Sequence, residues 1–363
     1  MKIATMVRAY LPAPRPADLV YAPIDLAMAI CEGLEEKGHS VTFYGPLGSK
    51  PPVSLRHMDI EPLAHDYEEF QSLIRNTELI VNGVLTSYDY YYARDMFERA
   101  RKGEFDLLHF HHPESALALA PLYPEVPVVY TLHDPIHPWK LKMFEMNASK
   151  NQFFVSISDS QRRPAPELPY IATVYNGIHL KDYEYSGVGG DYLLCAGRIV
   201  PEKGIAEAVQ LSRRTNQKLI IAGPVFPDSV KYFNKRIKPY LNKQIRYLGY
   251  VERDKLAPYL RGSKAFLMPI KWEETFGVTM IEAMASGTPV VAFNRGSVCE
   301  VVKDGITGFI VKDIRGMAAA ISKIDTIKRQ DCRDYAAQNF TMQNMVAGYE
   351  QAFKNAIKTL KKS

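Results

Sequence analysis

The strongest constraint on the fold is an alternation of short apolar runs with helix-like patterns, which recurs along most of the chain. Six such runs in the first half of the sequence have the composition of buried strands: residues 2–7, 40–44, 106–110, 127–132, 152–156 and 173–175. Between the first two, residues 23–37 carry apolar side chains at helical spacing. This alternation is typical of α/β proteins with parallel sheets. The sequence therefore predicts an α/β fold.

The alternation breaks at residues 179–191, which contain three glycines and lack apolar periodicity, so we interpret them as a linker. Strand-like runs then follow again: residues 192–196, 218–222, 265–268, 289–292 and 308–311. We expect two doubly wound, Rossmann-like lobes, an N-terminal lobe over 1–180, which a C-terminal helix over 345–363 rejoins, and a C-terminal lobe over 190–344. Ligands of such sheets bind at the carboxyl ends of the strands, so we expect the lobes to face a cleft that holds the site.

Composition and charge exclude several classes of protein. A chain of 363 residues corresponds to about two domains, and its 47% hydrophobic and 23% charged side chains are ordinary for a globular protein. A net charge of +5 is too small for a dedicated nucleic-acid binder. No apolar stretch approaches the roughly 20 residues that span a bilayer, and the run Ile3 to Val7 is too short for the apolar region of a signal peptide. The four cysteines lack disulfide or metal spacing, so we expect a cytoplasmic protein with free thiols.

Several catalytic motifs are absent from the sequence: GxGxxG after a strand, GxxxxGK[ST], HExxH, GxSxG and the paired aspartates of DxD. The missing glycine-rich motifs argue against a dinucleotide-binding dehydrogenase and a P-loop NTPase. The missing DxD argues against a metal-dependent nucleotide-sugar transferase.

The most informative segment runs from Lys271 to Ala292, KWEETFGVTMIEAMASGTPVVA. Gly277 is predicted to open a helix over about Val278 to Ser286, whose first amides would suit phosphate oxygens. Glu274 precedes this helix, and Glu282 lies one turn inside it. Two carboxylates would repel a phosphate, so we interpret them as acceptors for hydroxyls, one on a ribose and one on a sugar. Solvated surface charges are the alternative interpretation.

Three further side chains stand near predicted strand ends. Arg198 and Lys203, in GRIVPEKG, would flank a turn between a strand and a helix, where two cations could neutralise a leaving diphosphate. His133 closes the strand that ends in TLHD. Ordinary surface cations, and a histidine hydrogen-bonded to a loop, are the alternatives. The histidines of FDLLHFHH, residues 105–112, lack the spacing of metal ligands on a helix, so we expect no metal site.

These segments together resemble glycosyltransferase family 4, a retaining family with the two-lobed GT-B fold. Glu274, seven intervening residues and Glu282 carry the resemblance, followed by AMASGTPVVA and by DGITGFIV at residues 304–311. GRIVPEKG, FDLLHFHH, TLHD, YNGI at 175–178 and FTMQNMVAGY at 340–349 match the family in order and spacing. The resemblance extends over nearly the whole chain.

The resemblance implies a transferase that needs neither a metal nor another cofactor. Arg198 and Lys203 would neutralise the donor diphosphate, and Glu282 would hold the ribose. His133 would contact the donor sugar near the reacting carbon, and Glu274 would accept a hydrogen bond from a hydroxyl of that sugar. The remaining contacts with the sugar, the diphosphate and the base are expected from backbone groups: Phe276, Gly277, Val278, Thr279, Tyr250 and Val251.

The implied reaction moves a sugar from a nucleotide sugar, a UDP-sugar first and GDP-mannose next, to an acceptor hydroxyl with retained configuration. The acceptor would be a sugar, a lipid-linked glycan or a small molecule. A nucleotide-sugar epimerase, a phosphorylase and a non-catalytic nucleotide-sugar binding protein are the alternatives. Tyr21 and Ala22 replace the family's usual Gly-Gly pair, which suggests a loop adapted to a particular acceptor. The run Tyr88–Tyr92 suits weak peripheral membrane contact, although a helix with one core face explains it better.

Overall fold

The computed structural model describes residues 1–16, 19 and 21–362, and the chain divides into two compact units. The N-terminal unit comprises Met1–Tyr175 and Met342–Ser363, and the C-terminal unit comprises Asn176–Thr341. The division therefore falls after Tyr175, before the glycine-rich segment from which the sequence analysis inferred a linker. The chain returns to the N-terminal unit at Met342, three residues before the predicted helix 345–363, whose last residue lies outside the described part.

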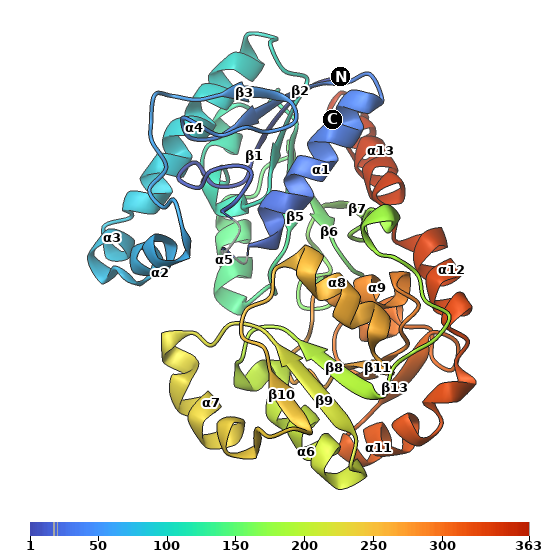
Figure 1. Cartoon of the computed structure of the whole chain (residues 1–363). Helices are drawn as coiled ribbons and strands as arrows, with labels where there is room; N and C mark the ends of the chain where they lie inside the picture. The colour runs from blue at the N-terminus through green and yellow to red at the C-terminus, as the bar shows by residue number, and fades with distance from the viewer. Residues whose placement is uncertain (17–18, 20, 363) are drawn as a thin grey trace. The chain divides into compact units, whose positions relative to one another are not determined.

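The N-terminal unit is built on a seven-stranded sheet in the order β3-β2-β1-β4-β5-β6-β7, in which every pair is parallel (Figure 1). Its strands are β1 (Lys2–Met6), β2 (Ser40–Tyr44), β3 (Ser54–Arg56), β4 (Leu107–Phe110), β5 (Val128–Leu132), β6 (Gln152–Ser156) and β7 (Tyr170–Thr173). Its helices are α1 (Ala22–Glu36), α2 (Tyr67–Arg75), α3 (Thr77–Val81), α4 (Val84–Arg101), α5 (Pro138–Met146) and α13 (Met342–Leu360). Every residue of β4, β5 and β6 is buried, as a strand with both faces covered requires.

The C-terminal unit is built on a six-stranded parallel sheet in the order β10-β9-β8-β11-β12-β13. Its strands are β8 (Tyr192–Ala196), β9 (Lys218–Ala222), β10 (Ile245–Tyr247), β11 (Ala265–Met268), β12 (Val290–Phe293) and β13 (Gly308–Val311). Its helices are α6 (Ile205–Thr215), α7 (Val230–Arg236), α8 (Arg253–Gly262), α9 (Val278–Ala285), α10 (Val298–Val301), α11 (Ile314–Ser322) and α12 (Arg329–Asn339). Two doubly wound α/β units confirm the predicted fold class.

Most strands lie where the apolar runs predict them. Six have the predicted bounds: β2, β6, β8, β9, β11 and β13. Two strands of three residues, β3 and β10, were not predicted, because short edge strands lack a continuous buried run. The strand expected at 173–175 lies earlier, at Tyr170–Thr173. Every residue of β7 is only half-buried, so the apolar run that marks a central strand is missing there.

The last helix, α13, packs on the N-terminal unit along α1. Met345, Val346 and Phe353 on α13 are buried in the same core cluster as the apolar face of α1. Gly33 permits the close approach, because a Cβ at that position would lie 2.5 Å from Cγ2 of Val346. The C-terminal helix therefore completes the core of the unit that begins the chain.

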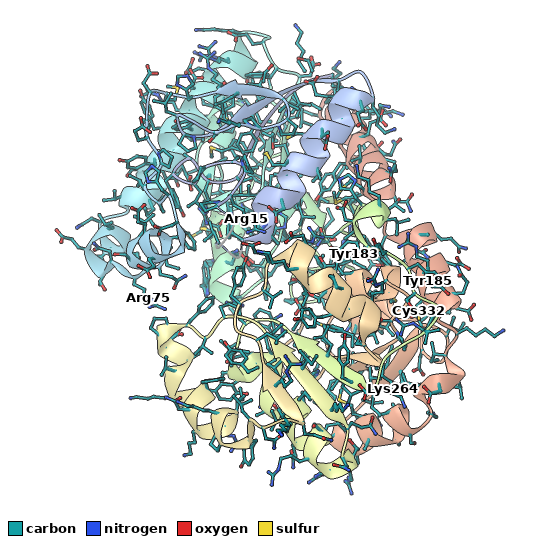
Figure 2. The ribbon with its side chains drawn as sticks, in the orientation of Figure 1. Arg15, Arg75, Tyr183, Tyr185, Lys264 and Cys332 are labelled. Atoms are coloured by element: carbon teal, nitrogen blue, oxygen red, sulfur yellow. The ribbon has the colours of Figure 1, made fainter. Side chains whose placement is uncertain are left out.

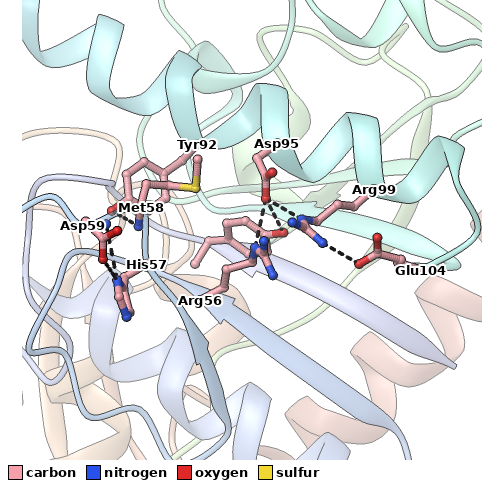
Figure 3. Close-up of polar contacts among 9 residues, drawn as sticks. Arg56, His57, Met58, Asp59, Tyr92, Asp95, Arg99 and Glu104 are labelled. Carbon is pink, nitrogen blue, oxygen red and sulfur yellow. Dashed lines mark hydrogen bonds and ion pairs between the residues drawn. The ribbon is translucent and has the colours of Figure 1, made fainter.

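Helix α4 carries the tyrosine- and arginine-rich segment. Tyr92 is fully buried, and the carboxylate of Asp95 accepts hydrogen bonds from Tyr44, Arg56 and Arg99 at 3.1, 3.1 and 2.8 Å (Figure 3). These contacts tie α4 to β2 and β3, which fits a helix with one core face. Within the described ranges, no helix combines the length and apolarity needed to cross a membrane.

The loop before α1 lies in the N-terminal unit. Tyr21 precedes the first turn of α1, and Val20 lies outside the described residues. The phenol of Tyr21 contacts Nε2 of His112, and the two rings are stacked with an angle of 6° between their planes. Tyr21 thus lies against a histidine at the carboxyl end of β4.

Candidate active site

The candidate residues of the C-terminal unit gather where the strand order of its sheet reverses. β8 and β11 are neighbours at the centre of the sheet, although β9 and β10 separate them in the sequence (Figure 1). Lys203 follows β8, and Glu274 follows β11. Ligands of open α/β sheets bind at the carboxyl ends of the strands at such a reversal. The topology alone therefore brings the two motifs of the sequence analysis to one place.

Lys203 and Glu274 form an ion pair at this edge of the sheet. The Nζ atom of Lys203 lies 2.7 Å from Oε2 of Glu274, whose side chain is 7% exposed. The indole Nε1 of Trp272 donates a second hydrogen bond to the same oxygen at 3.1 Å. The ammonium also lies 4.8 Å from the centroid of the Trp272 ring. A nearly buried carboxylate needs such partners, because burying an unpaired charge costs several kcal/mol.

A glycine sets the position of Lys203. Pro201–Lys203 form a single 3-10 turn, and Gly204 follows it in the left-handed region at φ 70°. A Cβ at Gly204 would lie 1.8 Å from the carbonyl oxygen of Pro269. The amide of Lys271 donates to the carbonyl of Glu202 at 2.8 Å. The loops after β8 and β11 therefore pack directly on each other, which explains why GRIVPEKG ends in glycine.

Glu282 is buried on α9 and is held by two donors. Its Oε1 accepts a hydrogen bond from the phenol of Tyr183 at 2.8 Å and one from Nε of Arg253 at 2.6 Å. Burial raises the pKa of Tyr183, and the charge of Glu282 adds to the effect, so the phenol keeps its proton. Tyr183, labelled in Figure 2, is 3% exposed. It lies within residues 179–191, which the lack of apolar periodicity predicts to be a linker, and that prediction is wrong for this buried residue.

The start of α9 offers backbone donors. Gly277 adopts a left-handed conformation, with φ 78°, immediately before the helix. The amides of Val278 and Thr279 begin the helix, and amides in a first helical turn have no intrahelical acceptor. Phe276 as a whole is 1% exposed and its ring lies edge-on to that of Phe340, so its side chain belongs to the core of the unit. The arrangement can bind an anion through main-chain N–H groups.

Three other predicted residues lie on loops of the same unit. Arg198 is exposed, and none of the ion pairs among the described residues includes it, so the structure does not join it to the Lys203–Glu274 pair. Tyr250 and Val251 lie between β10 and α8, at the same edge of the sheet. Gly249 immediately precedes Tyr250, and its carbonyl accepts a hydrogen bond at 2.7 Å from the amide of Gly223, which follows β9.

His133 lies in the N-terminal unit, directly after β5. Its Nε2 is 2.9 Å from Nδ1 of His111, and burial lowers its pKa to about 4. The imidazole is therefore neutral at neutral pH. Across the described residues there is no group of three or more His, Cys, Asp or Glu side chains arranged to hold a metal ion.

Sequence reasoning missed three side chains of the site. Trp272 is two residues before Glu274, and this short spacing was the one sequence signal that could have identified it as a partner of that carboxylate. Tyr183 and Arg253 lie 99 and 29 residues from Glu282. No local pattern marks either of them, because only the folded sheet brings the three together.

Two family models match the chain, one for each half. The model described as "Glycosyltransferase Family 4" matches residues 26–182, and the one described as "Glycosyl transferases group 1" matches residues 186–339. Together they cover most of the sequence. The second match contains the residues that the sequence predicts for the C-terminal unit, from Arg198 to Glu282, and the first contains His133.

Curated relatives are similar over part of their length. An uncharacterised 41.2 kDa protein in the cps region of Klebsiella pneumoniae is 30% identical over 45% of this chain and 46% of its own. A glycogen synthase of Mycobacterium tuberculosis is 28% identical over 60% of each chain. A phosphatidyl-myo-inositol mannosyltransferase of the same species is 26% identical over 64% of this chain and 67% of its own. The chain thus spans about half to two thirds of the length of these relatives.

Solved structures resemble the chain over nearly its whole length. Sucrose-phosphate synthase from Thermosynechococcus elongatus has a TM-score of 0.77 at 18% identity, covering 97% of this chain and 98% of that one. HepE from Anabaena, in complex with UDP and glucose, has a TM-score of 0.71 at 17% identity, covering 98% and 99%. At these low sequence identities, the structural similarity is evidence for a shared fold alone. Taken with the two family models, it shows that the chain belongs to the glycosyltransferases of the family 4 and group 1 type and has their GT-B fold.

Proposed function

We propose that this protein transfers a sugar from a nucleoside-diphosphate sugar to an acceptor hydroxyl, with retention of configuration and without a metal ion. The observation that carries the proposal is the Lys203–Glu274–Trp272 cluster beside the first turn of α9. It combines a cation for a phosphate, an acceptor for a sugar hydroxyl and helix amides for further oxygens.

The departing group in such a reaction is a nucleoside diphosphate, which gains negative charge as the glycosidic bond breaks. In the absence of a metal ion, protein cations must stabilise that charge. Lys203, which is partly buried, and Arg198, which is exposed, are the two candidates. The exposed guanidinium can take up a position on the diphosphate when the donor binds, whereas the turn before Gly204 already fixes Lys203.

The Lys203–Glu274 pair suggests how the donor is recognised. Without donor, each charge neutralises the other at 2.7 Å. A bound donor would offer phosphate oxygens to the ammonium and a sugar hydroxyl to the carboxylate, so both charges exchange one partner for another. A ligand with only one of these two groups would leave one nearly buried charge without compensation, which is a basis for selecting intact nucleotide sugars.

Glu282 is the candidate for the ribose. Oε1 is engaged by Tyr183 and Arg253, which orient the carboxylate, and ribose hydroxyls would donate to it. The loop with Tyr250 and Val251 would border the base through its backbone. In the proposed step, the bond between the anomeric carbon and the phosphate oxygen breaks, and the electron pair stays on the phosphate. The acceptor oxygen bonds to the same face of the carbon, and its proton passes to the leaving phosphate.

The donor and acceptor are chosen for testing from chemistry and similarity. A UDP-sugar comes first, since HepE binds UDP, and GDP-mannose comes next, since mannosyltransferases are among the relatives. The acceptor is proposed to be a sugar, a lipid-linked glycan or a small molecule with a free hydroxyl. A nucleotide-sugar epimerase, which needs no acceptor, is the second candidate, because its donor site would require the same cation and hydroxyl acceptor.

The proposal is tested by incubating the purified protein with UDP-, GDP- and ADP-sugars and measuring release of the nucleoside diphosphate, with and without EDTA. We expect release with at least one donor and no effect of EDTA. Release that disappears with EDTA would overturn metal independence. Absence of release with every donor and a panel of sugar acceptors would overturn transfer from nucleotide sugars.

A matched pair of lysine variants assigns the chemistry to the site. Lys203→Ala should lower turnover by about 100-fold, as expected for the loss of one group that stabilises transition-state charge. Lys243→Ala removes an exposed lysine of the same unit and should leave turnover unchanged. Equal turnover in the two variants would show that Lys203 has been misassigned.

A further inference from the structure

Two histidines at the carboxyl ends of β4 and β5 face each other. Nδ1 of His111 lies 2.9 Å from Nε2 of His133, and the rings are stacked with 5.2 Å between centroids and 9° between planes. His111 is 1% exposed, and its Nε2 has no hydrogen-bond partner among the described residues. The contact with His133 is therefore the single ring hydrogen bond that the described part of the chain gives to His111.

The neighbouring His109 is different, because hydroxyl groups engage both of its ring nitrogens. Nδ1 lies 3.2 Å from Oγ1 of Thr5, and Nε2 lies 2.9 Å from Oγ1 of Thr131. Thr131 donates its own hydrogen to the phenol of Tyr349 at 3.1 Å. His109 must then donate from Nε2 and accept at Nδ1, which is a closed structural network. The described residues form no such network around His111, so core packing alone does not explain a histidine at its position.

The protonation states of His111 and His133 determine which of the two rings donates the hydrogen bond between them. Burial lowers the pKa of His111 well below its usual value and that of His133 to about 4, so both rings are neutral at neutral pH. If His133 donated from Nε2, the hydrogen of His111 would lie on its buried and unpartnered Nε2. Unsatisfied buried N–H groups are rarer in proteins than unsatisfied acceptors. The favoured arrangement has His111 donating from Nδ1 to Nε2 of His133.

We propose that His111 is a positioning residue that fixes the ring plane of His133 and holds it as the Nδ1–H tautomer. In this state the Nε2 lone pair of His133 is occupied, so His133 acts on the substrate as a hydrogen-bond donor and not as a base. The effect on turnover rests on the proposed function, together with the contact between His133 and the donor sugar that the family resemblance implies. The hydrogen bond and the tautomer do not depend on that function.

Side-chain geometry supplies a matched set of variants. In His111→Asn, an amide group can occupy the place of Nδ1 and keep the hydrogen bond to His133. In His111→Gln the amide reaches the place of Nε2 instead, and His111→Leu removes the hydrogen bond. We expect kcat within about threefold of wild type for the Asn variant, and a loss of about tenfold or more in kcat for the other two.

A double-mutant cycle separates positioning from structural support. If His111 acts through His133, then His111→Leu should cost little further kcat in a protein that already carries His133→Ala. The control is His109→Leu, whose structural effect should add to that of His133→Ala. Independent, multiplying effects of His111→Leu and His133→Ala would overturn the proposal. An Asn variant as impaired as a folded Leu variant would overturn it too.

Nitrogen-15 NMR of labelled imidazole groups tests the proposal without any activity. We expect a neutral His133 in the Nδ1–H form at pH 7.5 in the wild type and in His111→Asn, and a mixture of tautomers in His111→Leu. A wild-type His133 protonated on Nε2, or a tautomer unchanged by His111→Leu, would overturn the proposal. If the protein turned over no nucleotide sugar, the proposed function would fail while this spectrum still decided the role of His111.

Discussion

Replacing Gly204 by alanine should destabilise the C-terminal unit more than replacing Gly305 by alanine. Gly204 has φ 70°, and Gly305, in a turn before β13, has φ 74°. Alanine in the left-handed region costs about 1 kcal/mol relative to glycine at either position. At Gly305 an added Cβ meets nothing within 4 Å, whereas at Gly204 it would lie 1.8 Å from the carbonyl oxygen of Pro269. Relieving such an overlap by moving backbone costs about 1–3 kcal/mol more.

We therefore expect Gly305→Ala to lower the unfolding free energy of this unit by about 1 kcal/mol and Gly204→Ala to lower it by about 2–4 kcal/mol. The chain has two tryptophans, Trp139 in the N-terminal unit and Trp272 in the C-terminal unit. In a Trp139→Phe background, tryptophan fluorescence during urea unfolding thus reports on the C-terminal unit alone. Both variants place alanine in the left-handed region, but only Gly204→Ala brings a Cβ against the carbonyl of Pro269. Equal stabilities of the two variants would therefore refute the reasoning.

The remaining predictions concern acid stability and the tryptophan beside the ion pair. Burial lowers the pKa of His109 to about 3 and that of His133 to about 4, so the unfolded chain takes up protons first as the pH falls. The N-terminal unit should lose about 1.4 kcal/mol of stability per pH unit for each of these histidines between about pH 6.5 and 4; urea midpoints that stay constant from pH 7.5 to 4.5 would contradict this. Trp272→Phe keeps an aromatic ring near the ammonium but removes the indole donor to Glu274. It should lower the stability of the C-terminal unit by about 1–3 kcal/mol, measured by circular dichroism, and wild-type stability would contradict the contact.

Periodicity predicted the fold well and the site in part. Continuous apolar runs such as that of β6 mark buried strands with accurate bounds, because both faces of those strands are covered. The half-buried β7 gave no such signal and was displaced in the prediction. Within the site, motifs identified Lys203 and Glu274 separately. Their pairing depends on β8 and β11 being neighbours, which is a property of strand order that spacing along the chain does not encode.

The side chains that were hardest to predict from the sequence are the buried partners of the predicted site residues. Tyr183 lies in a segment without periodicity, and yet it is buried against Glu282. His111 lies in a run of six apolar or histidine residues, 107–112, in which nothing distinguishes its role from that of His109. The distinction is one of hydrogen bonding, since hydroxyl groups engage both nitrogens of His109 but not those of His111.

The central claim is that the C-terminal unit binds a nucleoside diphosphate at the Lys203–Glu274 pair. Isothermal titration of UDP, GDP and ADP into the wild type, Lys203→Ala and Lys243→Ala tests it most directly. We predict that at least one diphosphate binds the wild type and Lys243→Ala equally. A charge-assisted hydrogen bond contributes about 1.5–3 kcal/mol, so Lys203→Ala should bind about 10- to 100-fold more weakly. Unchanged affinity in Lys203→Ala, or no binding of any diphosphate to the wild type, would contradict the claim.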